Sequence, residues 1–173
     1  LQRRRQRQMC IRDRDTADGL GGGNDKKSKI EKMRDSKIGS YGVLAILLIT
    51  LIKWNAIITL ATGKPYEIAI LSIICAHSLS RFSIIVIPYF SIPASDEGLA
   101  RYAGEPETRG VIGGFLLTSF LIFLLLPFDQ AILSAVLAIL VAGVVGLLAN
   151  FQIKGYTGDI LGAAQQVSEA TVL

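Results

Sequence analysis

Residues 41–60 read YGVLAILLITLIKWNAIITL, and this stretch decides the fold class of the chain. It carries one charged side chain, Lys53, and its length matches the ~20 residues with which a helix crosses the hydrocarbon core of a bilayer. Three further apolar runs follow it. Together they predict four membrane spans, at 41–60, 68–90, 110–128 and 130–149. A fifth run, 160–173, is too short to cross, so we expect it to lie at the interface or to be cut off.

The composition agrees with a membrane protein. The chain has 173 residues, of which 51% are hydrophobic and only 8% aromatic, and its mean hydropathy is +0.48. Charge is concentrated before the first span and in a few short connections, a segregation that the bilayer explains. We therefore predict an all-α fold: a polytopic transmembrane helical bundle with an interfacial N-terminal helical segment, forming a single membrane-embedded domain over 15–173.

The first fourteen residues, LQRRRQRQMCIRDR, differ from everything that follows. They have no apolar periodicity, and they lack the hydrophobic stretch and cleavage site of a signal peptide. We expect 1–14 to be a disordered leader that is foreign to the rest of the chain. Cys10 in this leader and Cys75 in the second apolar run have no spacing typical of a disulfide or a zinc site.

The basic residues predict the orientation in the membrane. Twelve Lys and Arg residues precede Tyr41, two lie in 91–109 and one in 150–159, whereas Lys64 stands alone on the opposite side. This bias favours a cytoplasmic N-terminus and gives no reason to expect nucleic acid as a partner. Because successive spans cross the membrane in opposite directions, the connections between them alternate between its two sides. Three segments rich in glycine and charge, at 15–42, 91–109 and 150–166, are therefore expected on the same side of the membrane.

Hard oxygen ligands are concentrated in the first of these segments. Asp15 and Asp18 are three residues apart, so a helix would place them on one face. The glycines at 21–23 would end that helix, and Asp25 can begin another that brings Asp35 back to the same region. Three carboxylates without histidine or thiol suit Mg²⁺ or Mn²⁺, with a phosphate as further ligand.

The alternative interpretation of this segment is a capped, solvated turn at the membrane interface. The spacing of the aspartates alone favours neither the metal site nor the solvated turn.

Charged residues within the predicted spans need an explanation, because an unpaired charge in the bilayer core is costly. His77 and Arg81 share a helical face in the second span. We expect Arg81 to point into the bundle interior, where it binds a substrate phosphate or pairs with a neighbouring helix. Lys53, next to Trp54, is expected to extend its ammonium group to the far interface.

Two further segments leave alternatives open. Asp159 can cap the helix that follows it or reach a ligand. The long connection 91–109 can act as a lid over a site or be a solvated loop. Gly39 and Gly42, at the start of the first span, are expected to permit close helix packing.

Three motifs resemble those of the adenosylcobinamide-GDP ribazoletransferase (cobalamin synthase) family: DTADGLGGG from Asp15, MRDSKIGSYGVLA from Met33 and GYTGDILGAAQQVSE from Gly155. The resemblance covers 15–173. It implies a polytopic inner-membrane, magnesium-dependent transferase that joins adenosylcobinamide-GDP to α-ribazole or its 5′-phosphate. The products would be adenosylcobalamin or its phosphate, and GMP, in the last steps of cobalamin biosynthesis.

The resemblance also implies roles for individual residues. The metal ligands and catalytic residues would be Asp15, Asp18 and Asp35, and the substrate-binding residues would be Ser36, Lys37, Arg81, Thr157 and Asp159. Two departures stand out. Lys154 replaces an expected glycine, and an Asp-Gly pair expected at Ile11 and Arg12 is missing. The resemblance thus implies a member truncated at both ends, which puts the activity of this chain in doubt.

Two other functions compete with this interpretation. A phosphotransferase acting on a CDP-alcohol also uses interfacial aspartates and Mg²⁺, but its usual DG-x-x-AR spacing is not found in the sequence. A small transporter would use His77 and Arg81 as a pathway, but the chain shows no internal repeat, and its motifs lie on one side.

Overall fold

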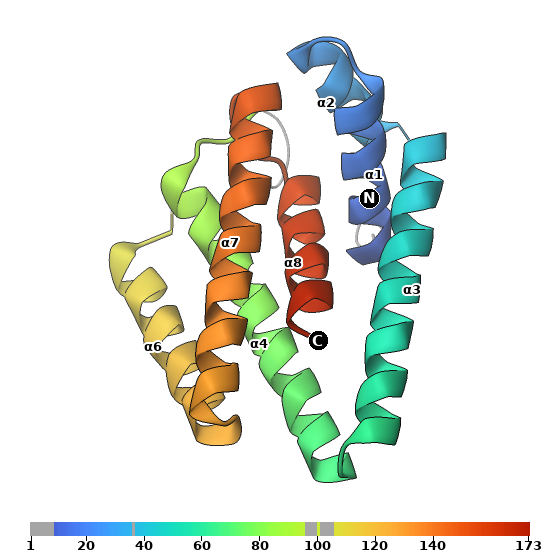
Figure 1. Cartoon of the computed structure of the whole chain (residues 1–173). Helices are drawn as coiled ribbons and strands as arrows, with labels where there is room; N and C mark the ends of the chain where they lie inside the picture. The colour runs from blue at the N-terminus through green and yellow to red at the C-terminus, as the bar shows by residue number, and fades with distance from the viewer. Residues whose placement is uncertain (1–8, 36, 96–99, 101–105) are drawn as a thin grey trace, which may run out of the picture.

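The computed structural model describes residues 9–35, 37–95, 100 and 106–173. Its named elements are all helices, which confirms the predicted all-α class (Figure 1). In chain order they are α1 (Met9–Gly22), α2 (Lys26–Arg34), α3 (Ser40–Gly63), α4 (Tyr66–Phe90), α6 (Thr108–Leu125), α7 (Phe128–Ile153) and α8 (Gly158–Val172).

Four of these helices, α3, α4, α6 and α7, are long and apolar enough to cross a membrane. The mean hydropathy of their most apolar windows is 2.2, 1.9, 1.8 and 2.8, respectively. Many of their large apolar side chains, such as Leu51, Phe120 and Leu147, point outward, as lipid-facing residues do. The four predicted spans are therefore confirmed, and α3, α4 and α7 extend beyond the predicted ends by a few residues.

Two tight turns connect these helices in pairs. Lys64 and Pro65 join α3 to α4, and Leu126 and Pro127 join α6 to α7. Each proline is the N-cap of the helix that follows, with φ of −52° at Pro65 and −53° at Pro127. Because the proline ring fixes φ near these values, both turns are set by local sequence, as predicted.

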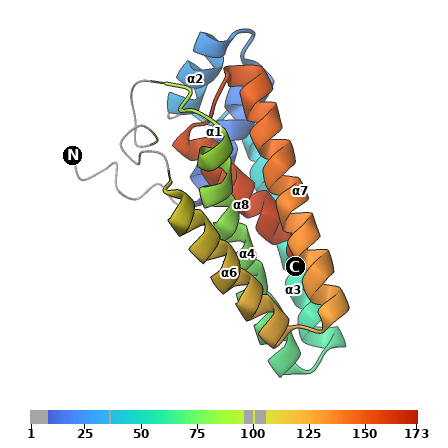
Figure 2. The same ribbon diagram turned by 90° about the vertical axis from the view of Figure 1, so that its left-hand side faces the viewer.

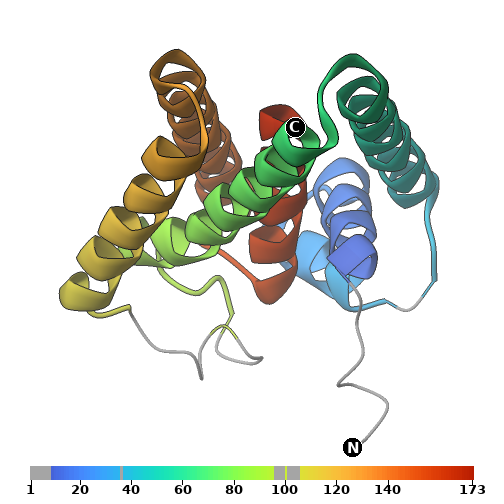
Figure 3. The same ribbon diagram turned by 90° about the horizontal axis from the view of Figure 1, so that it is seen from below.

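Helix α8 corresponds to the fifth apolar run, and its position corrects the prediction. It lies inside the bundle, packed against α1, α4 and α7 (Figure 1). Seen from below, α4 and α8 separate the α6–α7 pair from α1 and α3 (Figure 3). Small residues such as Gly162, Ala163 and Ala164 allow this close approach, and all three are buried. The side view shows α6 running alongside α4, with its beginning turned away from α7 (Figure 2).

The N-terminal part corrects a second prediction. Helix α1 begins at Met9, so the last six residues of the expected disordered leader, Met9–Arg14, are helical. Helix α1 ends at Gly22 and Asp25 is the N-cap of α2, as predicted, and α2 ends at Arg34. Helix α1 packs between α3 and α8 (Figure 1).

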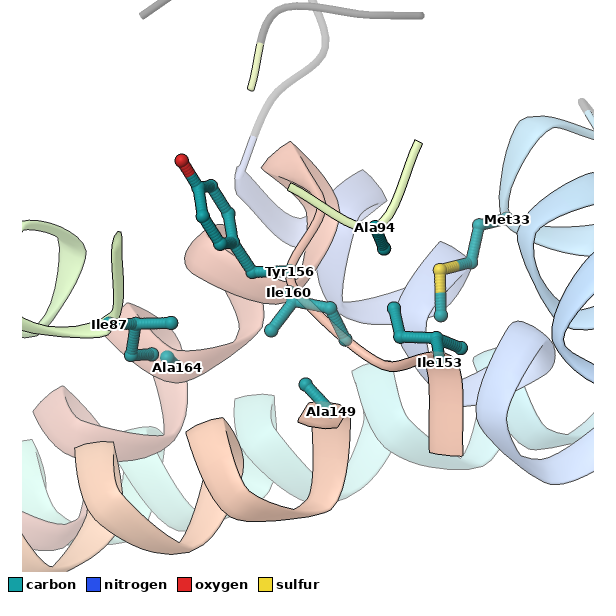
Figure 4. Close-up of a cluster of buried hydrophobic side chains, with 8 residues drawn as sticks. All are labelled: Met33, Ile87, Ala94, Ala149, Ile153, Tyr156, Ile160 and Ala164. Atoms are coloured by element: carbon teal, nitrogen blue, oxygen red, sulfur yellow. The ribbon is translucent and has the colours of Figure 1, made fainter. Parts of the chain in front are cut away.

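A buried apolar cluster fixes one end of the bundle. Figure 4 shows its members: Met33, Ile87, Ala94, Ala149, Ile153, Tyr156, Ile160 and Ala164. They come from α2, α4, α7, α8 and the segments beside them, so burying them joins elements that are far apart in sequence. Burial of apolar area stabilises these contacts, and the cluster therefore holds the neighbouring polar segments in a defined place.

Candidate functional site

The three segments rich in glycine and charge meet at this end of the bundle, as expected for segments on the same side of the membrane. The main chain of Tyr156 pairs with the segment after α4: its N–H donates to Ile92 at 2.9 Å, and its carbonyl accepts from Ala94 at 2.8 Å. From α2, Arg34 donates to the Ser95 hydroxyl at 2.8 Å and Lys29 to the Gln152 side chain at 2.6 Å. The part of the connection at 96–99 and 101–105, proposed as a lid, lies outside the described residues.

Asp18 connects α1 to the start of α3. Its carboxylate accepts the main-chain N–H of Gly39 and of Gly42, both at 2.8 Å. The free N–H groups at the start of a helix carry partial positive charge, so a carboxylate there is strongly favoured. A Cβ on either glycine would collide with the Asp18 carboxylate. The two glycines therefore permit the approach of a carboxylate, which is a different role from the helix packing that we expected.

Asp15 lies one turn before Asp18 on α1, which confirms that both residues are on one helix. Its side chain is 1% exposed and accepts two hydrogen bonds from Arg14, at 2.9 Å from Nε and 2.5 Å from Nη2. A buried carboxylate needs such a partner, because an unpaired charge away from water is costly. The arginine that compensates Asp15 is the last residue of the expected leader, so Arg14 belongs to the folded part of the chain.

Asp35 does not join the other two carboxylates. It is exposed, and its Oδ1 accepts the N–H of Lys37 at 3.0 Å in a local turn. Ser36 lies outside the described residues. Among the residues that the structure describes, no three Asp, Glu, His or Cys side chains are grouped so that they could hold a metal ion. The three-carboxylate arrangement is thus not formed, because each aspartate is held by a different neighbour.

A smaller donor set does suit magnesium. Mg²⁺ commonly takes one or two carboxylates from the protein and completes its shell with water and substrate phosphates. Asp18, whose two carboxylate oxygens accept one main-chain N–H each, keeps lone pairs for a cation, and Asp15 lies one turn away on the same face of α1. Asp18 thus fits magnesium chemistry with Asp15 beside it, whereas no group of three such side chains is found among the described residues.

The start of α8 excludes one of the two roles considered for Asp159, that of the helix cap. Thr157 is the N-cap of α8, and its Oγ1 accepts the N–H of Ile160 at 3.3 Å. Asp159 lies in the first turn, half-buried, and does not cap the helix. Just before it, Gly155 has a φ of +151°, and a Cβ there would collide with the Ile92 carbonyl. This glycine is therefore needed for the pairing with the segment after α4.

Arg81 corrects a further prediction. Its side chain is exposed on α4 and donates to the His77 carbonyl at 3.2 Å, whereas we expected it to point into the bundle. The buried face of α4 at this level is formed by Ser80 and Ser83, whose hydroxyls bond to carbonyls of their own helix at 3.0 and 2.6 Å. Arg81 is one residue from this face, and helical geometry turns it outward.

Lys53 also differs from its prediction. Instead of reaching the far interface, its Nζ donates to Glu169 on α8 at 2.8 Å and to the side chain of Gln166. The second Glu169 oxygen lies 3.1 Å from Nδ1 of His77. Sequence reasoning missed Glu169, and an acidic side chain in the last apolar run was the signal that could have found it.

A separate pocket lies between α4, α6 and α7. Its lining is mainly apolar, including Phe82, Val86, Phe115 and Ile139, and none of the described side chains that line it is charged. A site of this kind suits apolar groups and not phosphate. This pocket is thus separate from the aspartates of α1.

Known proteins similar to this chain identify its family. The sequence model of the family described as cobalamin-5-phosphate synthase matches residues 14–173. Proteins named adenosylcobinamide-GDP ribazoletransferase are 38% identical over 159 residues in Bradyrhizobium diazoefficiens and 40% identical over 160 residues in Shewanella pealeana. These matches cover 92% and 91% of this chain, but only 60% and 61% of the relatives.

A third relative with the same name, from Mesorhizobium japonicum, is 38% identical over 92% of this chain and 60% of its own length. The chain therefore spans about 60% of the length of the curated relatives that it matches. No solved structure matches it. Because the family match begins at Arg14 and includes Asp15, Asp18 and the whole of α8, the chain belongs to the cobalamin-5-phosphate synthase family.

Proposed function

We propose that the protein to which this chain belongs joins adenosylcobinamide-GDP to α-ribazole or its 5′-phosphate and releases GMP. The observation that carries the proposal is the family match over 14–173, whose relatives bear the name adenosylcobinamide-GDP ribazoletransferase. In this reaction an oxygen of the ribazole attacks the phosphorus that remains with the cobinamide, and the bond from that phosphorus to GMP breaks. The step concentrates charge on the pyrophosphate oxygens.

The end of the bundle around Asp18 has the features that a pyrophosphate site needs. Exposed basic side chains, Lys32 and Lys37, surround the start of α3 and can hold anionic oxygens. Ser36, Thr157 and Asp159 belong to the segments that meet there, and we assign them to substrate binding together with Lys37. Arg81 would join them only through a part of the substrate that reaches the outer face of α4.

Magnesium is part of the proposal. We assign the ion to Asp15 and Asp18, with the pyrophosphate of the substrate supplying further oxygen ligands. When bound, the ion would neutralise charge on the pyrophosphate. Asp35 would act through the turn it makes with Lys37, which holds that lysine near the anion.

We further propose that the α1–α2 end faces the cytoplasm and that the protein resides in the inner membrane. The support is the distribution of Lys and Arg, fifteen on that side against Lys64 on the other. Both substrates would then reach the site from the cytoplasm. Labelling of a single cysteine placed at position 25 or 64, in a variant without the other cysteines, tests this orientation in intact cells.

The decisive assay uses two proteins in lipid nanodiscs: this chain, and this chain extended at its N-terminus with the corresponding residues of the Bradyrhizobium diazoefficiens relative. Each is incubated with adenosylcobinamide-GDP, α-ribazole and Mg²⁺, and the corrin products and GMP are separated by chromatography. We expect ribazole-dependent GMP release from the extended protein, which stops when Mg²⁺ is chelated and in the Asp18→Asn variant.

A matched control and a competing acceptor sharpen the assay. Asp25→Asn changes an exposed aspartate of the same end and should keep full activity. Replacing α-ribazole with a lipid alcohol should give no product. If the extended protein makes no product while the intact relative does, or if it prefers the lipid alcohol, the proposed function is wrong.

A further inference from the structure

Three ionisable side chains from three helices meet halfway along the bundle. Lys53 belongs to α3, His77 to α4 and Glu169 to α8. One Glu169 oxygen accepts from Lys53 at 2.8 Å, and the other lies 3.1 Å from Nδ1 of His77. Lys53 and His77 are both near the middle of their spans, so this meeting point lies deep in the membrane part of the bundle.

Stability alone does not account for these residues. The Lys53 and Glu169 side chains are only 17% and 8% exposed, so both charges have lost most of their water. Desolvation offsets most of the attraction in a buried ion pair, and well-packed apolar residues of similar volume are often as stable. Charged groups at membrane depth are rare and tend to serve a site.

The surroundings of this ion pair contain hydrogen-bonding capacity that the protein does not use. Gln165 Oε1 and Ser168 Oγ are buried and have no partner among the described residues, and the same holds for Thr16 Oγ1 on α1. Gln165 precedes Glu169 by one turn, so the two side chains lie on the same face of α8. His77 is 46% exposed, and its Nε2 points away from the carboxylate that holds Nδ1.

This polar cluster, defined as Lys53, His77, Gln165, Gln166 and Glu169, adjoins the candidate site. Asp13 on α1 lies close enough to Lys53 and Glu169 for their charges to act on its carboxyl group. Asp13 is two residues from Asp15. The cluster and the aspartates are therefore successive levels of one polar interface between α1 and α8, which pack against each other.

The charge of the cluster indicates what it can bind. The Lys53 ammonium and the Glu169 carboxylate cancel, so the cluster offers no surplus charge to a phosphate. It offers both donors and acceptors: lysine N–H, glutamine amide and imidazole. Such a set matches an uncharged group that itself donates and accepts hydrogen bonds, which is the chemistry of sugar hydroxyls.

We propose that the polar cluster binds those ribose hydroxyls of the uncharged riboside α-ribazole that do not react, while the attacking ribose hydroxyl reaches the charged pyrophosphate of the other substrate at the Asp15–Asp18 level. The inference rests on the proposed function, because that function supplies the riboside. An uncharged riboside is less costly to desolvate than a pyrophosphate, and hydrogen bonds from the cluster would compensate its buried hydroxyls. Glu169 acts as a positioning residue that holds Lys53 and His77 towards the ligand.

The test separates substrate binding from a purely structural ion pair. Binding of radiolabelled α-ribazole to the extended protein in nanodiscs is measured by equilibrium dialysis, and KM is measured for each substrate. The variants are Glu169→Gln, Lys53→Gln and the double exchange K53E/E169K, which keeps an ion pair between α3 and α8. Exposed residues at the far turn supply the matched controls, Glu67→Gln and Lys64→Gln.

We expect both single variants to weaken α-ribazole binding and raise its KM by about tenfold or more, as lost hydrogen bonds in a desolvated site do. The KM for adenosylcobinamide-GDP should stay within about twofold of the parent value, and the controls should bind like the parent. The double exchange should recover the Tm of the parent, because an ion pair between α3 and α8 is kept. It should not recover the α-ribazole affinity, because the ammonium donor is then on α8 and the carboxylate acceptor on α3.

Recovery of affinity in the double exchange would overturn the inference, because an ion pair alone would then suffice. Failure of the unsubstituted protein to bind α-ribazole would overturn it as well, and so would an equal rise in the KM for adenosylcobinamide-GDP. The dialysis needs no turnover. Binding that depends on Glu169 without any release of GMP would thus contradict the proposed reaction while leaving the binding site in place.

Discussion

Gly42 donates its main-chain N–H to the Asp18 carboxylate at 2.8 Å, and a side chain on Gly42 would occupy the place of that carboxylate. The two residues are 24 positions apart, and their contact fixes where α1 meets α3. The glycine thus has a spatial role, and the aspartate supplies negative charge where the helix N-terminus favours it.

Gly42→Ala should therefore lower the stability of the protein although alanine is the better helix former. The gain in helix propensity is about 1 kcal/mol, whereas forcing a Cβ against Asp18 and Arg14 costs roughly 1–3 kcal/mol and also breaks the hydrogen bond. Thermal unfolding in detergent should show a lower Tm. The control is Gly143→Ala on α7, where a Cβ meets nothing within 4 Å, so Tm should stay or rise. Equal behaviour of the two variants would contradict the steric argument.

Asp18→Asn should also destabilise the protein, apart from any effect on activity. An amide has only one oxygen, so its NH₂ group would face one of the two N–H donors of Gly39 and Gly42. Leaving a partly buried donor without a partner costs about 1–3 kcal/mol. At Asp25, the exposed N-cap of α2 with no side-chain cap bond, the same change should alter stability by less than about 0.5 kcal/mol. Chemical denaturation of both variants checks this, and an unchanged Asp18→Asn midpoint would remove Asp18 from the α1–α3 contact.

Much of the fold could be predicted from the sequence, because length and hydropathy of a span are local properties. The four spans, the proline turns and the meeting of three polar segments at one end followed from such patterns. The partners of individual charges did not. Lys53 reaches Glu169 across 116 positions, and Arg14 compensates Asp15 from within the expected leader. Such pairings depend on tertiary packing, as does the burial of the short helix α8, and no local pattern encodes them.

Lys154→Gly should stabilise the protein. Lys154 ends α7 with a φ of +54°, in the left-handed region, where a residue with a Cβ is about 1–2 kcal/mol less favourable than in its ordinary conformation. Glycine adopts this conformation freely but loses more entropy on folding, so the net gain should be about 0.5–1 kcal/mol.

A second lysine at a helix end provides the control. Lys64 ends α3 with a φ of −132°, an extended conformation that any residue adopts. Lys64→Gly should therefore give no increase in Tm, whereas Lys154→Gly should raise it. If both substitutions raised Tm alike, the gain would not come from relief of the left-handed backbone, because Lys64 is already extended.

Asp13 makes stability depend on pH. Burial raises the pKa of Asp13 from 3.8 to about 7, while the charge of Lys53 opposes the rise and that of Glu169 adds to it. Between these values the folded protein binds a proton that the unfolded chain has released. Stability should therefore fall as pH rises from about 4 to about 7 and change no further through this group above that range.

Asp13→Asn removes this titration while keeping the size of the side chain. The variant should match the parent at pH 4 and exceed it by about 1 kcal/mol or more at pH 7.5, because the parent must then either keep a proton on Asp13 or bury a charge. Tm measured across this range in one detergent, with the exposed Asp129→Asn as control, gives the difference directly. A constant difference between variant and parent at every pH would show that Asp13 is charged in the folded protein throughout, paired with Lys53 in place of carrying a proton.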